Sequence, residues 1–174
     1  IKKIISIEPE SQNYALLNKN IHINDLSNQI LALNIGLSDE SKMDMLFISK
    51  FEAGAALHNL GLNEDWKKNK FDPAFEQAVI SFSLDDFLNT YKGNFPTHLK
   101  IDVDGIERKI INGSKQTLKN PKLKEIIIEL NNELDDDIEI IEIFKNNGFT
   151  EISNRSTDEN GEHSSLTNYI FKRK

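Results

Sequence analysis

The chain has 174 residues, of which 38% are hydrophobic, and its formal net charge is −7 at pH 7. This length can bury a core and fits a single domain over residues 1–174, while no apolar run is long enough to cross a membrane. The acidic balance excludes binding to nucleic acid through a cationic surface, and the absence of cysteine excludes disulfides, thiolate metal sites and thiol nucleophiles.

The chain starts at Ile1 rather than at methionine, and a strand pattern follows almost at once. Lys2 and Lys3 precede only a short apolar run before Ser6, which does not fit a secretory signal peptide. We therefore expect a cytoplasmic protein in which further residues precede Ile1.

The first predicted strand, Ile4–Ile7, is followed directly by Glu8, and a helical pattern begins at Ser11. In a Rossmann-type sheet, a carboxylate at the tip of such a strand accepts hydrogen bonds from the hydroxyls of a nucleoside ribose. An acid in this place also stabilises the positive end of the following helix. The sequence leaves both interpretations of Glu8 open.

Strand patterns continue along the first half of the chain. We expect a buried strand over Ile30–Ile35, an edge strand over Met43–Ile48 and a short strand over Ala78–Phe82. Ser49–Pro73 has little periodicity, and loops of this length are usually functional lids or disordered excursions. Ser83 is placed as a helix N-cap, because acids follow it in the first helical turn.

The most informative stretch runs from Leu99 to Glu107, where a strand pattern ends in acids and a helical pattern begins. A parallel strand over Leu99–Ile101 places Asp102 at the rim of an open α/β sheet, where such folds bind their ligands. Asp104 and Glu107 lie near the start of the next helix, whose positive end they would stabilise. A ligand site and a helix start are both compatible with these acids.

The second half of the chain continues the alternation. Ile126–Leu130 predicts a buried strand, and Ile138, Ile141 and Phe144 mark the apolar face of the helix after it. The chain closes with a predicted antiparallel hairpin whose last strand is Leu166–Phe171.

Four stretches resemble the FkbM-type methyltransferases, and together they cover nearly the whole chain. They are Glu8-Pro9-Glu10 with Tyr14, Leu16, Leu17 and Asn20; Asn34-Ile35-Gly36-Leu37-Ser38-Asp39; Ser83-Leu84-Asp85-Asp86-Phe87 with the run from His98 to Glu107; and Ile128-Glu129-Leu130 with Asn147-Gly148-Phe149. The departures are Asp104, where the family usually has glutamate, and Ile106, where it usually has alanine.

The resemblance implies a Rossmann-like class I methyltransferase sheet of the α/β class, mostly parallel with an antiparallel C-terminal strand. It also implies methyl transfer from S-adenosylmethionine to a hydroxyl oxygen of a small molecule or carbohydrate. In this fold the first strand lies in the middle of the sheet, and a glycine-rich turn after it holds the methionine part of the cofactor. No Gly-x-Gly occurs here, so that strand and turn are expected to lie outside this chain.

A chain without that strand and turn should have little activity of its own. We expect it to bind S-adenosylmethionine very weakly, because contacts to the ribose alone must overcome the entropy of association. We also expect its unpaired strand edges to pair with another copy, which would make it a homo-oligomer.

Roles for single residues follow from the resemblance. Glu8 would hold the ribose hydroxyls, in agreement with the interpretation from its strand. Gly36, Leu37 and Ser38 would border the adenine, Leu37 by apolar contact and Ser38 by a hydrogen bond. Asp102 would bind the amino group of the cofactor or take the acceptor proton.

The remaining candidates concern a base and a metal. His58 is the best of the four histidines for a catalytic base, because its segment could cover the acceptor. Asp102 and Glu129, with Asn131 or Asn132, could offer oxygen ligands to Mg²⁺. Acids near strand tips are common without a metal, so no metal is expected.

Two other classes of protein are compatible with these residues. A nucleotide-dependent oxidoreductase also places an acid at the tip of its second strand, although it should not end in an antiparallel hairpin. A non-catalytic Rossmann-like binding domain needs no catalytic residue. A strand followed by Gly-x-Gly ahead of Ile1 would favour the methyltransferase.

Overall fold

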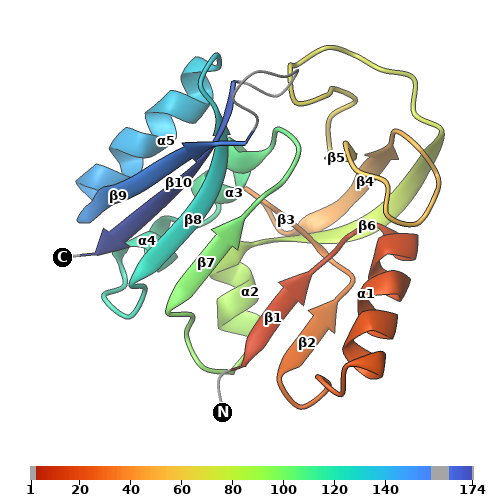
Figure 1. Cartoon of the computed structure of the whole chain (residues 1–174), viewed down its shortest axis with the longest axis horizontal. Helices are drawn as coiled ribbons and strands as arrows, with labels where there is room; N and C mark the ends of the chain where they lie inside the picture. Colours follow the sequence, from red (N-terminus) through yellow and green to blue (C-terminus); the bar gives the residue numbers. More distant parts are fainter. Residues whose placement is uncertain (1–2, 158–164, 174) are drawn as a thin grey trace. The chain divides into compact units, whose positions relative to one another are not determined.

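The computed structural model of the chain describes residues 3–157 and 165–173 and divides into two compact units, Ile1–Phe82 and Ser83–Lys174 (Figure 1). The first unit holds β1 (Ile4–Ile7), α1 (Ser11–Ile23), β2 (Ile30–Leu33), β3 (Gly36–Ser38), β4 (Lys42–Ile48), β5 (Asn59–Leu60) and nearly all of β6 (Phe75–Ser83). The second holds α2 (Leu84–Thr90), β7 (His98–Ile101), α3 (Glu107–Asn112), α4 (Lys115–Lys119), β8 (Glu125–Asn131), α5 (Asp135–Asn146), β9 (Phe149–Ser156) and β10 (Leu166–Arg173).

The first unit contains a parallel pair, in which β1 and β2 align Ile4 with Ile30 and Ile7 with Leu33. Helix α1 connects them, because parallel neighbours need a crossover connection, which is usually a helix. The predicted strand Ile30–Ile35 ends earlier than expected, at Leu33. Beyond it, the Asn34 side-chain amide donates to the carbonyls of Glu8 and Pro9, which fixes the chain at the carboxyl end of β1.

A second sheet of this unit has the order β3-β6-β4-β5. The expected edge strand over Met43–Ile48 is therefore wrong, because β4 lies between β6 and β5 and pairs antiparallel with both. Strand β6 runs over Phe75–Ser83 rather than over Ala78–Phe82, since its pairing with β4 extends to Phe75 opposite Ile48. The long segment Ser49–Pro73 contains β5 and a bridge between Glu64 and Lys70.

The sheet of the second unit has the order β7-β8-β10-β9, in which only β7 and β8 are parallel. Helix α5 packs on β8 and β9 (Figure 1). The Phe144 and Phe171 rings meet edge to face with their centroids 4.9 Å apart. The core side chains with at most 1% exposure in this unit are Leu118, Leu123, Ile126, Ile128, Leu130, Ile140, Phe144 and Phe171.

Arg173 ties the end of β10 to this core. Its guanidinium donates to the carbonyls of Leu123, Asn147 and Leu118 at 2.9, 2.6 and 2.5 Å, and it lies over the Phe149 ring. One side chain therefore satisfies three backbone carbonyls near the end of the described chain.

The expectation of one mostly parallel sheet needs correction. The sheets are mixed, and their antiparallel pairs join β4 to β5 and β6, and β10 to β8 and β9. The parallel pairs β1–β2 and β7–β8 belong to separate sheets, because β1 pairs only with β2 and β7 only with β8 among the described strands. The antiparallel C-terminal hairpin is confirmed.

The apolar face predicted for the last helix is also corrected. Helix α5 buries Ile140 and Phe144, whereas Ile138 is 40% exposed. Asp137 lies on the buried face as well, where its carboxylate accepts a hydrogen bond from the Asn131 amide of β8. Through the described residues, no helix combines the length and apolar character that a membrane crossing demands.

Candidate functional site

Glu8 lies just past the carboxyl end of β1, as the sequence predicts. Its backbone amide extends the parallel pair by donating to the Leu33 carbonyl at 3.0 Å. The half-buried carboxylate accepts a hydrogen bond from the Glu10 amide at 2.9 Å. A carboxylate has about four lone-pair sites, so a carboxylate in this place can accept several hydrogen bonds at once.

The acid that supports the start of α1 is Glu10. Its carboxylate accepts hydrogen bonds from the Gln12 and Asn13 amides at 2.9 and 2.6 Å, and the residue is only 2% exposed. Because Glu10 occupies the N-cap position, the helix-start interpretation belongs to it rather than to Glu8.

Gln77 of β6 fixes the same turn from far along the sequence. Its side-chain amide donates to the Pro9 carbonyl at 2.7 Å and accepts from the Ser11 amide at 3.0 Å. Both ends of one amide group thus hold the backbone between Glu8 and α1. No sequence pattern signals this contact, since the partners are 68 residues apart.

The Gly36–Ser38 stretch forms β3 immediately after β2. Gly36 packs closely against β5, because a Cβ atom there would lie 2.6 Å from Leu60 Cδ2 and would force that side chain to move. Ser38 is 1% exposed, and its hydroxyl donates to the Asp39 carboxylate at 3.0 Å. Leu37 is half-buried, which makes it the side chain of the three with accessible apolar surface.

His58 belongs to the segment before β5. Its Nδ1 lies 3.4 Å from both the amide nitrogen and the hydroxyl of Ser49, and its buried Nε2 has no hydrogen-bond partner among the described residues. Asn13 of α1 holds the same segment, since it accepts from the Gly54 amide at 2.7 Å and donates to the Ala55 carbonyl at 2.9 Å. The segment is therefore anchored to the helix that follows Glu8.

Asp102 follows β7 in the second unit, at the carboxyl end of the parallel pair β7–β8. Its side chain is 46% exposed and forms an ion pair with Lys100 at 2.6 Å. Glu107, the first residue of α3, is buried, and its carboxylate accepts from the Gly105 amide at 3.4 Å. Glu107 therefore stabilises the turn and does not present its carboxylate to solvent.

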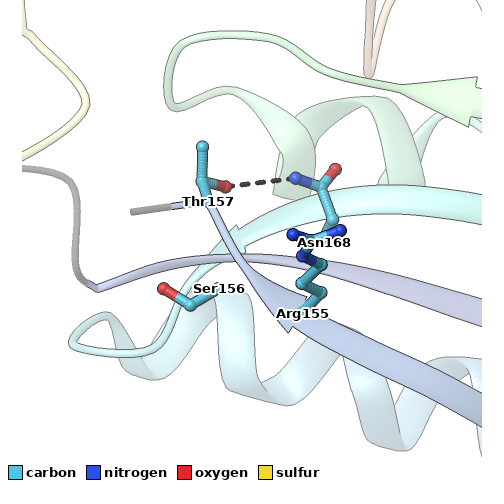
Figure 2. A pocket seen from close by; sticks show the side chains of 4 residues that line it. All are labelled: Arg155, Ser156, Thr157 and Asn168. Carbon is cyan, nitrogen blue, oxygen red and sulfur yellow. Dashed lines mark hydrogen bonds between the residues drawn. The ribbon is translucent and has the colours of Figure 1, made fainter. Parts of the chain in front are cut away.

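Polar residues that the sequence did not single out lie at the same end of this sheet. Arg155, Ser156, Thr157 and Asn168 line an open hollow of about 440 Å³ (Figure 2). The Asn168 amide donates to the Thr157 hydroxyl at 3.1 Å and to the Glu129 carboxylate at 3.1 Å. The lining residues come from the end of β9 and from β10, which are separated in the sequence, so no sequence motif connects them.

The predicted residues are thus divided between the units. Glu8, the Gly36–Ser38 stretch and His58 belong to the first unit, and Asp102 belongs to the second. Within the described ranges, no group of three or more His, Asp or Glu side chains is placed to hold a metal ion.

The chain is thus of the mixed α/β class, with acids at the carboxyl ends of its two parallel strand pairs. The sequence matches the family model for the methyltransferase FkbM domain over residues 1–151. The chain therefore belongs to the FkbM methyltransferase family. No curated protein matches its sequence.

One solved structure with the same fold is the crystal structure of methyltransferase FkbM from Methylobacillus flagellatus KT. The two superpose with a TM-score of 0.61 at 12% sequence identity, over 97% of this chain and 36% of that chain. This chain therefore spans about a third of the length of its solved relative.

Proposed function

We propose that this chain is part of an enzyme that transfers a methyl group from S-adenosylmethionine to a hydroxyl oxygen of a small molecule or carbohydrate. Membership of the FkbM methyltransferase family over residues 1–151 carries the proposal. The position of Glu8 at the carboxyl end of β1 supports it independently, because this is where Rossmann-type sheets hold a ribose.

The residues of the first unit fit the nucleoside part of the cofactor. Glu8 would accept hydrogen bonds from the ribose hydroxyls, and its carboxylate is held in place by the Glu10 amide. Leu37 would contact the adenine ring, with Gly36 and Ser38 as the backbone beside it. Asn34 and Gln77 would affect cofactor binding indirectly, because their side chains donate hydrogen bonds to the backbone carbonyls of Glu8 and Pro9.

When bound, S-adenosylmethionine supplies the methyl group as an electrophilic carbon on a sulfonium. The protein must then orient the acceptor and receive the proton of its hydroxyl. The exposed Asp102 carboxylate would take that proton or bind the amino group of the cofactor. His58 is the second candidate for the base, because the segment that carries it is anchored beside the Glu8 turn by Asn13.

Substituting Glu8 tests the cofactor site. In the full-length protein, Glu8→Ala should weaken S-adenosylmethionine binding by about 1.5–3 kcal/mol, the usual contribution of hydrogen bonds to a charged group. Isothermal titration calorimetry measures this change, and Glu142→Ala on the exposed side of α5 is the matched control. An unchanged affinity in Glu8→Ala would remove Glu8 from the site.

A further inference from the structure

Four polar residues lie in one row across the sheet of the second unit. The strand registers place Glu129 of β8 opposite Asn168 of β10, and Asn168 opposite Arg155 of β9. On the other side, Ile101 of β7 pairs with Ile128, so Asp102 follows at the level of Glu129. The row therefore runs from Asp102, just past the end of β7, through Glu129 and Asn168 to Arg155.

The middle of the row is held by hydrogen bonds between side chains. Thr157 donates its hydroxyl proton to the Glu129 carboxylate at 2.6 Å, and the Asn168 amide donates to the same carboxylate oxygen at 3.1 Å. These contacts put the three side chains on one face of the sheet and fix their orientation. The second carboxylate oxygen of Glu129 and the side-chain oxygen of Asn168 are hydrogen-bond acceptors, and such groups can bind sugar hydroxyls.

The two ends of the row differ in charge. At one end the carboxylate of Asp102 is paired with Lys100, which shares its face of the sheet. At the other end the exposed Arg155 forms no ion pair with the described residues and lines the hollow beside Asn168 (Figure 2). A guanidinium in this setting suits a carboxylate, which it binds through two parallel hydrogen bonds.

We propose that this row binds the methyl acceptor and that the acceptor is an acidic carbohydrate. This inference rests on the proposed function and specifies its substrate class. The carboxylate of the sugar acid pairs with Arg155, its hydroxyls bond Glu129 and Asn168, and the hydroxyl to be methylated lies toward Asp102. The backbones at Asp102 and Arg155 are three strand spacings apart, which is about 14 Å. The long Arg155 side chain reaches back along the row, so the distance between the two charged groups is closer to the size of one sugar unit.

The assignment is tested by titrating this chain with D-glucuronate and, separately, with D-glucose. Binding is monitored through the backbone amide NMR signals of Thr157 and Asn168. The two probes differ by a carboxylate, so the wild-type chain should bind glucuronate about fivefold tighter than glucose, in line with a partly exposed charge-assisted contact. Arg155→Gln should abolish this preference and leave glucose binding unchanged. Arg108→Gln is the control, because Arg108 pairs with Glu139 of α5 outside the row.

Several results would overturn the assignment. Equal affinity of the wild-type chain for the two sugars, or no binding of glucuronate, would exclude an acidic carbohydrate. An unchanged preference in Arg155→Gln would exclude Arg155 as its anchor, and acetate binding as tightly as glucuronate would exclude the hydroxyl contacts. These titrations contain no S-adenosylmethionine, so their outcome is separate from the calorimetric test of cofactor binding.

Discussion

At the scale of single residues, neighbouring acids have different tasks. Glu8 and Glu10 stand two positions apart, and an acid at either place would suit a helix start. In the structure the N-cap of α1 is Glu10, which is buried and accepts hydrogen bonds from the first turn of the helix. Glu8 is half-buried at the end of β1. The ribose interpretation of Glu8 therefore no longer competes with a capping role.

Tyr169 makes a residue-scale prediction about alkaline pH. Burial raises the pKa of its phenol above the usual value near 10, and the hydroxyl donates a hydrogen bond to the Asn132 side-chain oxygen at 2.8 Å. A pKa raised by folding means that the folded state favours the neutral phenol. The stability that this contributes is complete below about pH 10 and is lost as the pH rises through the folded pKa.

The comparison of wild type with Tyr169→Phe isolates this effect. The variant should lose about 0.5–1.5 kcal/mol of unfolding free energy at neutral pH, because it lacks the hydrogen bond to Asn132. The difference between the two proteins should shrink above about pH 10. Urea denaturation over this pH range measures it, with Tyr14→Phe as control, and a constant difference would contradict the burial argument.

At the scale of elements, α2 and α4 are coupled through Asp85. Its carboxylate accepts hydrogen bonds from the Gln116 amide at 2.8 Å, and from the amide and hydroxyl of Thr117 at 2.8 and 2.6 Å. Helix α4 has no side-chain cap of its own at Ser114, so a side chain of another helix satisfies its first amides.

Removing that carboxylate should destabilise the second unit. We expect Asp85→Ala to lower the free energy of unfolding by about 2 kcal/mol, from the loss of a cap and of charge-assisted hydrogen bonds. Chemical denaturation followed by circular dichroism measures the loss. Asp72→Ala, at an exposed position, should change stability by less than about 0.5 kcal/mol. Equal effects of the two substitutions would show that Asp85 does not hold α4.

At the scale of the whole molecule, the second unit has a core of its own. Its fully buried side chains come from α4, β8, α5, β10 and the connection between α4 and β8, and Arg173 ties the end of β10 to that core. A unit with its own core can fold alone. A fragment of residues 83–174 should therefore unfold cooperatively in urea.

The control for this fragment is Ile128→Asp, which places a charge at a fully buried position of β8 and should abolish folding. Dispersed amide signals in the NMR spectrum of the unchanged fragment would accompany the cooperative transition. A gradual transition with undispersed signals would instead show that the fragment depends on residues 1–82.

Much of the fold could be predicted from the sequence because it is local. Ile4–Ile7 and Ile126–Leu130 are strands as expected, and Ser83 caps α2 through a hydrogen bond from the Asp86 amide. The antiparallel hairpin that ends at β10 was likewise predicted. Periodicity and capping depend on residues a few positions apart, so one sequence contains them.

What only the tertiary structure decided is which distant segments meet. The sequence alone identified the FkbM family and placed Glu8 and Asp102 at the ends of strands, because a strand and the acid that follows it are contiguous in the chain. The sequence did not predict that β4 lies inside its sheet, that the Gln77 side chain bonds the turn after Glu8, or that a row of polar residues ends at Arg155. These features depend on strand order and register, which are set by the packing of a whole sheet against its core, and a pattern within one strand does not encode its partner.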